Sequence, residues 1–332
     1  MGGYLIMPGI QTSNGKAFEY AVLTNFFEVL TNEGFNVTLN PSPAFRTAEN
    51  KFNSLSHEVK LTMRRAALAS IETIRGFEPN LKYGDEEIRL SILEDNKGTA
   101  GDVSDIVIEK SSLNWRIGIS CKHNHAALKH SRLSPTIDFG KSWLGYSCSD
   151  NYWNVVRPQF NYFSSLISDL PKDRRPTWSS IAATPQKKAE LIYIPILNAF
   201  SDELIRLADL YPDVPSKLVE YLLGRKDFYK VIANEREKRT TIQAFNIHDS
   251  LSQNYGPHKA SPRALSLSRK LPTKIFDISL KPNGNTIKVT MDEGWALSLR
   301  LHNASSKIEP SLKFDIQLIG SPSSLTSIST YW

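Results

Sequence analysis

A strand–turn–strand pattern between Asp105 and Lys122 constrains the fold of this chain more than any other feature. Two runs rich in β-branched and aromatic residues cover 105–109 (Asp-Ile-Val-Ile-Glu) and 115–122 (Trp-Arg-Ile-Gly-Ile-Ser-Cys-Lys). A polar Ser-Ser-Leu-Asn stretch separates them. Such runs around a short polar turn are typical of a β-hairpin. The segment therefore predicts two adjacent antiparallel strands.

The alternation within the second run assigns each side chain to a face. Side chains two residues apart share a face of a strand. One set is apolar and is expected to face the core: Trp115, Ile117, Ile119 and Cys121. The other set then projects to the opposite face: Arg116, Gly118, Ser120 and Lys122. Because the start of one hairpin strand lies beside the end of the next, Asp105 is expected to meet Lys122.

Hydrophobic spacing predicts further elements on both sides of the hairpin. Apolar residues at three- and four-residue steps predict helices over 14–33, before Gly34, and over 56–74. A short strand is expected over 35–39, whereas 86–93 fits either a strand or a short helix. The apolar run 191–200 predicts a buried strand that leads into a helix over 201–210, and 217–223 predicts another helix.

After about residue 240 the pattern changes to short alternating runs. These runs cover 287–291, 295–302 and 312–319, and Pro-Asn-Gly at 282–284 is one of the turn signals between them. We therefore predict an α/β (α+β) chain with a mixed central sheet flanked by helices and a β-rich C-terminal subdomain. The expected division is residues 1–240 and residues 241–332.

Composition narrows the classes of function. Forty Lys and Arg against 34 Asp and Glu leave a mild net charge of +6, which permits a polyanionic partner. Residues 225–274 alone hold 11 Lys and Arg against 4 Asp and Glu. This basic stretch is expected to be either a solvated helix face or a surface that binds a polyanion. Neither a membrane span nor a secretion signal is expected. Cys121 and Cys148 fit no zinc or disulfide pattern, so a cytoplasmic protein is predicted.

A carboxylate and a lysine at adjoining strand ends suit metal-assisted hydrolysis of a phosphodiester. Magnesium prefers oxygen ligands and usually takes one or two protein carboxylates. A neighbouring lysine can orient the attacking water and stabilise the developing charge. Asp105 and Lys122 are the candidates for these two roles, and Asp102 in the preceding Gly-Asp loop is a rival to Asp105.

The order acid, strand, turn, strand, acid-x-Lys resembles the PD-(D/E)XK nuclease core. This sequence departs from the pattern because Ser120 stands where the second acid is expected. Glu19 in Gly-Lys-Ala-Phe-Glu (15–19) resembles the helical glutamate of many such nucleases, and it is our preferred substitute ligand. Asp138 is the second choice. Ser120 is then expected to hold the metal through a water molecule.

A closer resemblance extends over much of the chain. Blocks at 101–105, 119–125, 129–134, 137–140, 221–224 with 227–230, 300–304 and 311–315 resemble HaeIII-type type II restriction endonucleases. The resemblance implies Mg²⁺-dependent cleavage of both strands of double-stranded DNA at the palindrome GGCC. It also implies a cognate DNA methyltransferase in the same system. A repair or structure-specific nuclease and a non-catalytic DNA-binding relative are the alternatives.

Palindromic DNA is two-fold symmetric, so a homodimer with one site per strand is expected, with a monomer that nicks the strands in turn as the alternative. Residues 1–240 would form the catalytic domain, and 241–332 would contribute to DNA recognition. Lys230 is expected to be structural or to contact the DNA backbone.

Two groups of side chains are candidates for DNA contacts. A basic stretch follows the second hairpin strand and holds His123, Asn124, His125, Lys129, His130 and Arg132. These residues suit phosphate contacts, with solvated surface as the alternative. Arg300 and His302 share a face of a predicted strand and could read base edges, since arginine pairs with guanine O6 and N7. A structural salt bridge explains Arg300 equally well.

Overall fold

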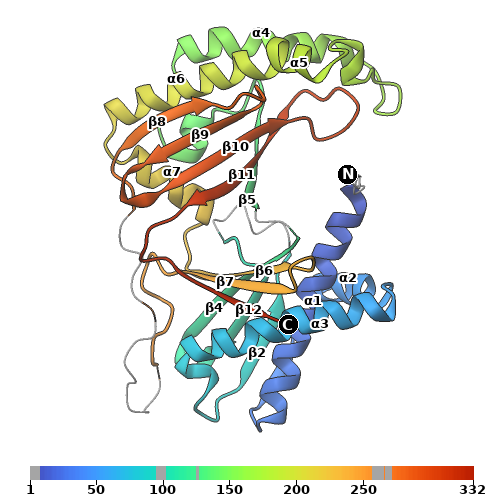
Figure 1. Ribbon diagram of the computed structural model, residues 1–332, viewed down its shortest axis with the longest axis vertical. Helices are drawn as coiled ribbons and strands as arrows, with labels where there is room; N and C mark the ends of the chain where they lie inside the picture. The colour runs from blue at the N-terminus through green and yellow to red at the C-terminus, as the bar shows by residue number, and fades with distance from the viewer. Residues whose placement is uncertain (1–7, 95–101, 125–126, 256–264, 266–270) are drawn as a thin grey trace. The chain divides into compact units, whose positions relative to one another are not determined.

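The computed structural model describes residues 8–94, 102–124, 127–255, 265 and 271–332. These residues form two compact units (Figure 1). Unit 1 comprises Met1–Ala126, Gly224–Arg269 and Ser323–Trp332, and unit 2 comprises Ala127–Leu223 and Lys270–Pro322. The chain therefore leaves unit 1 twice and ends in it.

Unit 1 contains a seven-stranded mixed sheet in the order β1-β2-β3-β4-β6-β7-β12. Its strands are β1 (Val37–Leu39), β2 (Ile88–Ile92), β3 (Ile106–Lys110), β4 (Trp115–His123), β6 (Phe228–Asn234), β7 (Arg239–Phe245) and β12 (Thr326–Tyr331). The predicted hairpin is confirmed, because β3 and β4 pair antiparallel with Ile106 opposite Ile119. The strand β4 also pairs in parallel with β6, so it lies inside the sheet.

Three helices cover the core of unit 1: α1 (Pro8–Asn32), α2 (Pro43–Asn53) and α3 (His57–Phe77). The helix α1 packs against β4, and α3 packs against β6 and β7 (Figure 1). The hydroxyls of Ser42 and Ser56 cap α2 and α3 by accepting backbone N–H groups, which satisfies donors that a helix start leaves open. Gly34, with a φ of 88°, follows α1. The helices predicted over 14–33 and 56–74 are confirmed, and the ambiguous segment 86–93 contains β2.

Unit 2 contains an antiparallel sheet in the order β5-β11-β10-β9-β8. Its strands are β5 (Ala127–Leu133), β8 (Ile275–Leu280), β9 (Thr286–Met291), β10 (Ala296–His302) and β11 (Leu312–Gly320). Its helices are α4 (Asp150–Ile167), α5 (Pro185–Lys188), α6 (Ile194–Leu210) and α7 (Val214–Leu223). The helices α4 and α6 pack together, and α6 also contacts β8 (Figure 1). The strands predicted over 287–291, 295–302 and 312–319 are confirmed.

The strand predicted over 191–200 is wrong. This segment forms the π-helical turn η6 (Ala189–Tyr193) and the first turns of α6. Pro195 lies where the π-helical turn η6 passes directly into α6, since Tyr193 and Ile194 both keep helical φ and ψ. A proline inside a helical run removes one backbone donor, and π-helical turns are a common irregularity of helices. Ile196 and Phe200 are buried four residues apart, so the run follows a helical period. A short, almost wholly apolar run does not reveal its period from the sequence.

The β-rich C-terminal segment is divided between the two sheets. Four of its strands, β8 to β11, lie in unit 2, whereas β12 pairs with β7 at the edge of the unit 1 sheet. The predicted fold class, a mixed sheet with packed helices and a β-rich C-terminal part, is confirmed. The functional division at residue 240 stays a prediction.

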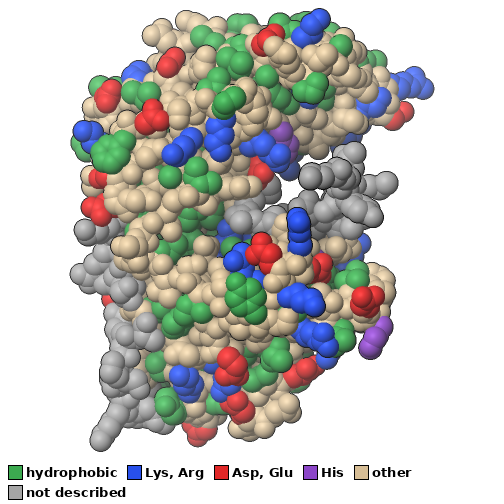
Figure 2. Space-filling model, viewed as in Figure 1, with side chains coloured by type: hydrophobic (Ala, Val, Ile, Leu, Met, Phe, Trp, Pro, Cys, Tyr) green, Lys and Arg blue, Asp and Glu red, His purple; other side chains and the backbone are tan. Residues whose placement is uncertain are grey.

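Charged side chains of both signs are interspersed over the face of the molecule that Figure 2 shows. Apolar side chains lie singly or in small groups among them (Figure 2). In the part of the chain that the structure describes, no helix combines the length and apolar character that crossing a membrane demands.

Gly118 on β4 provides a test of this packing. A Cβ atom at this position would lie 2.0 Å from Ser104 Oγ and 2.9 Å from Ser104 Cβ. We expect Gly118→Ala to lower the free energy of unfolding by about 1–3 kcal/mol, the usual cost of overpacking. Ser104→Gly in the same chain removes both atoms and should restore most of the loss. Urea unfolding measures the effect, and a double variant no more stable than Gly118→Ala would contradict it.

Candidate active site

The Asp105 carboxylate is held by donors from β4. Its Oδ2 atom accepts a hydrogen bond from the Cys121 backbone N–H at 2.7 Å and from Ser120 Oγ at 3.2 Å. Lys122 Nζ lies 3.4 Å from the same oxygen. The Asp105 backbone N–H donates to the Ile119 carbonyl at 2.9 Å, which continues the β3–β4 pairing. The predicted approach of Asp105 to Lys122 is confirmed.

The alternation along β4 separates the apolar core from the polar site. The side chains of Trp115, Ile117, Ile119 and Cys121 all belong to the core of unit 1. The Lys122 and Asp105 side chains are 19% and 21% exposed, so both remain partly open to solvent. We call the face of the sheet that carries Arg116, Gly118, Ser120 and Lys122 the polar face.

Glu19 brings a second carboxyl group to this site from α1. It is buried, and Lys16 Nζ lies 3.1 Å from its Oε2. Burial, and then the negative charge of Asp105, raise the pKa of Glu19 to about 8, although Lys16 and Lys122 act in the opposite direction. Glu19 therefore lies within electrostatic range of Asp105 and Lys122.

The two carboxyl groups fit a divalent cation. A cation between Glu19 and Asp105 would remove the repulsion that helps to raise the pKa of Glu19, and Mg²⁺ commonly takes only one or two protein carboxylates. Within the described residues, no group of three or more His, Cys, Asp or Glu side chains could hold a metal. Two carboxyl groups are a donor set that a divalent cation such as Mg²⁺ can accept.

Asp102 has a different set of partners. Its Oδ2 accepts a hydrogen bond from the Arg116 guanidinium at 2.7 Å and lies 3.5 Å from Lys226 Nζ. Burial acts to raise the pKa of Asp102, but the hydrogen bonds from Arg116 and Ser104 hold it below its usual value. Asp102 is therefore neutralised by basic side chains, and its role as a metal ligand stays a prediction.

Asp138, the other acid considered from the sequence, lies in unit 2. Its carboxylate accepts backbone N–H groups of Lys141 and Cys148. Its side chain therefore fixes the local turn around η4 (Gly140–Leu144).

His123 and Asn124 connect the end of β4 to the β6–β7 turn. His123 is buried, its Nε2 lies 2.9 Å from Glu235 Oε1, and its ring packs against Phe18. Asn124 Oδ1 accepts the Glu235 backbone N–H at 3.0 Å. Both side chains therefore have structural partners, and their DNA contacts stay a prediction.

The remaining DNA-contact candidates fall into three groups. His125 lies outside the described residues, and Lys129 and His130 are placed on β5 by their backbone alone. Arg132 is 43% exposed and donates to Ser311 Oγ at 2.7 Å. None of these contacts tests binding to DNA.

Arg300 and His302 share a face of β10, as the alternation predicts. The Arg300 side chain is 54% exposed and its guanidinium lies 3.0 Å from Asp315 Oδ2 on β11. His302 Nδ1 lies 2.9 Å from the Asn303 carbonyl, and burial lowers the pKa of this imidazole. The structural salt bridge of Arg300 is therefore present, and base reading stays a prediction.

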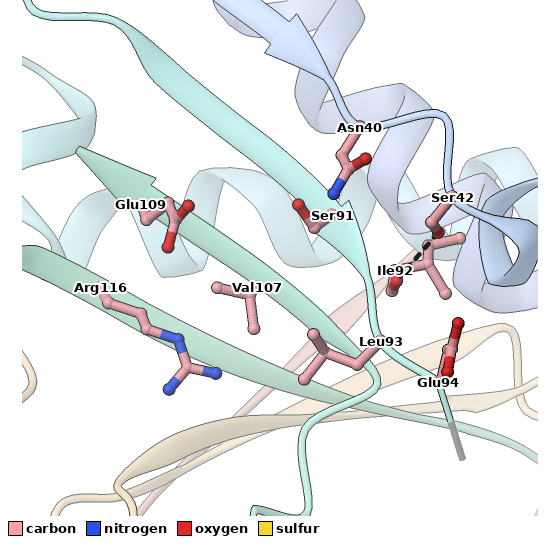
Figure 3. A pocket seen from close by; sticks show the side chains of 9 residues that line it. All are labelled: Asn40, Ser42, Ser91, Ile92, Leu93, Glu94, Val107, Glu109 and Arg116. Carbon is pink, nitrogen blue, oxygen red and sulfur yellow. Dashed lines mark hydrogen bonds between the residues drawn. The ribbon is translucent and has the colours of Figure 1, made fainter. Parts of the chain in front are cut away.

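A cavity of about 430 Å³ lies on the polar face beside the hairpin (Figure 3). Glu109 from β3 and Arg116 from β4 line it together with Ser91 from β2 (Figure 3). Glu109 pairs with Arg116, and Ser91 pairs with Val107, two residues before Glu109 on the same strand. The polar face thus offers hydrogen-bonding groups well beyond Asp105 and Lys122.

Comparison with known proteins identifies the family. A sequence model of the HaeIII restriction endonuclease family matches residues 15–322. The chain is also 40% identical to the type II restriction enzyme HaeIII of Haemophilus aegyptius, over 98% of this chain and 99% of that protein. The chain belongs to the HaeIII restriction endonuclease family. The predicted enzyme class, a restriction endonuclease, is confirmed, and no solved structure gives a significant match.

In this HaeIII-family chain, Lys230 joins the site from β6. Lys230 pairs in register with Ser120, which places both side chains on the polar face. It is 2% exposed. Burial, and then the positive charge of Lys122, lower the pKa of Lys230 to about 7, with Asp105 opposing them. The sequence-based expectation of a structural or backbone-contacting role missed this placement, because nothing local predicts that β6 pairs with β4.

Because Lys230 is buried and its pKa is lowered, the free energy of unfolding of the chain should rise with pH. Its pKa of about 7 in the folded chain lies below about 10.4 in the unfolded chain, so unfolding takes up a proton between these pH values. Without bound metal, the free energy of unfolding of the wild type should rise more steeply with pH than that of the Lys230→Met variant. The two slopes should differ by at most about 1.4 kcal/mol per pH unit. Urea unfolding at several pH values between about 7 and 10 measures both slopes. Equal slopes would contradict the lowered pKa of Lys230.

Proposed function

We propose that this chain is a Mg²⁺-dependent type II restriction endonuclease that cuts both strands of double-stranded DNA at a short palindrome. GGCC is the target that the resemblance to HaeIII-type enzymes implies. The observation that carries the proposal is the meeting of Glu19, Asp105 and Lys122 in a chain of this family.

Glu19 and Asp105 would hold the metal, with Ser120 acting through a water molecule. Bound Mg²⁺ would supply the positive charge that stabilises the phosphate oxygens and lowers the pKa of an attacking water. The Cys121 N–H and the Ser120 hydroxyl hold one Asp105 oxygen in place, which leaves the other oxygen for the ligand role. This arrangement corresponds to a PD-(D/E)XK site in which the second acid comes from α1.

Lys122 would act on the reacting groups. Its ammonium group, 3.4 Å from Asp105 Oδ2, is partly exposed and therefore accessible to a phosphate bound beside Asp105. From this position Nζ would orient the attacking water and donate to the phosphate oxygens as negative charge builds on them.

We further propose that the enzyme acts as a homodimer, because a palindrome presents the same cut site on both strands. Residues 241–332 would contribute to recognition, with Arg300 and His302 as base contacts. Lys129, His130 and Arg132, in the basic stretch that follows β4, would contact the DNA backbone. The functional partner is a cognate DNA methyltransferase that protects the host sites.

Plasmid digestion tests the proposal. The wild type with Mg²⁺ should give discrete bands that end at GGCC, and Lys122→Ala should cleave at least about 100-fold more slowly. Lys82→Ala, which removes an exposed lysine of unit 1, is the matched control and should cleave normally. A smear would indicate a non-specific nuclease. Shifted but uncut DNA would indicate the non-catalytic relative that Ser120 permits.

Glu19→Gln tests the helical ligand. The change keeps the side-chain shape but removes the carboxyl group that would ionise when it binds the metal. The Mg²⁺ concentration for half-maximal cleavage should therefore rise about tenfold or more, within the range of effects seen when a metal site loses a supporting group. Glu28→Gln on the same helix, which removes the surface ion pair with Arg64, is the control. An unchanged Mg²⁺ requirement in Glu19→Gln would exclude Glu19 as a ligand.

A further inference from the structure

A second cavity, of about 240 Å³, opens on the polar face between β4 and the start of β6. Its lining includes Ser104, Arg116, Arg225, Lys226, His248 and Ser250. We propose that this basic cavity binds a backbone phosphate of the DNA that lies a few positions away from the phosphate that is cut. The proposal rests on the proposed nuclease function and adds a substrate contact to it.

The position of the cavity along β4 fits a phosphate a few positions from the cut. Gly118 and Arg116 line it, and both stand in the same row of β4 as Lys122. Gly118 precedes Lys122 by four positions, a distance of about 13 Å along a strand. One strand of duplex DNA advances by about 3.4 Å per phosphate along its axis. A strand that passes Lys122 along this face therefore brings another phosphate over the cavity.

The cavity keeps positive charge after its internal ion pairs are counted. Asp102 lies against Arg116 and Lys226. Asp227 accepts hydrogen bonds from the backbone N–H groups of Ile247, His248 and Ser250 and from the Ser250 hydroxyl. The Asp227 carboxylate is thus committed to the turn that forms one wall.

Arg225 is the cation that remains available. It is exposed, and within the described part of the chain no carboxylate pairs with it. Three cationic side chains, on Arg116, Arg225 and Lys226, therefore face two carboxylates. The forked guanidinium of arginine matches the geometry of a phosphate, and the Ser104 hydroxyl and the His248 ring lie in the same lining. This chemistry suits a phosphodiester anion.

Arg116 lines this cavity and also the cavity beside the hairpin, where Figure 3 shows it. The two cavities therefore share one cationic side chain on the sheet of unit 1. Arg225 and Lys226 begin the stretch 225–274, which the sequence shows to hold a surplus of basic residues. At least the first two of these charges therefore serve a defined cavity.

Equilibrium DNA binding over a range of salt concentrations tests the proposal, with Ca²⁺ in place of Mg²⁺ to suppress cleavage. Arg225→Ala and the double variant Arg225→Ala, Lys226→Ala should bind cognate and non-cognate duplexes more weakly by a similar factor. The slope of log K against log salt should become shallower by about 1 for each phosphate that the variant no longer neutralises. Lys51→Ala combined with Lys82→Ala removes the same charge elsewhere on unit 1 and should leave the slope unchanged.

Neutral methylphosphonate linkages, placed one at a time along the duplex, then identify the phosphate. At one position outside the cut bond, the substitution should weaken binding by the wild type but have no further effect on the Arg225→Ala, Lys226→Ala variant. Additive losses at every position, or variant slopes equal to that of the control, would overturn the proposal. A wild type that neither binds nor cuts DNA would instead refute the proposed function. The Arg225→Ala variant breaks no ion pair in the described part of the chain, so it is expected to fold normally.

Discussion

The packing of β4 inside its sheet is the constraint on which the site depends. One face of this strand buries Trp115, Ile117 and Ile119 in the core of unit 1, so any slip by one residue would expose all of them. The same register fixes Ser120 and Lys122 on the polar face and holds the Cys121 N–H against Asp105. The hydrophobic core thereby sets the geometry of a polar site that contributes little to the core itself.

The charges at the site are held at a cost in stability. Burial and the neighbouring charges of like sign raise the pKa of Glu19 and lower the pKa of Lys230. Such a cluster is unfavourable unless an opposite charge compensates it. A divalent cation would compensate the carboxyl groups, and a phosphate would compensate the lysines. The shifted pKa values of Glu19 and Lys230 thus agree with the proposed Mg²⁺ and phosphate ligands, since perturbed groups cluster at functional sites.

The insertion of unit 2 between β4 and β6 explains why the sequence order hides the site. The chain leaves unit 1 after Ala126 and returns at Gly224, and only then does β6 pair with β4. Parallel strands need such a crossover connection. Lys230 follows Lys122 only after the whole Ala127–Leu223 segment of unit 2, although the two strands are neighbours. Residues close in sequence to Lys122, such as His123 and Asn124, are instead engaged with Glu235.

The sequence by itself determined the local features: the hairpin, the two faces of β4, the meeting of Asp105 with Lys122, the main helices of unit 1 and the family. Period-two alternation and helical spacing depend only on residues that are close along the chain, so the sequence alone predicts them. Only the tertiary structure decided that 191–200 is helical, that Asp102 pairs with Arg116 and Lys226, and that Lys230 joins the site. Each of these depends on which distant surface buries or neutralises a side chain, and that choice is made by packing between segments rather than by neighbours along the chain.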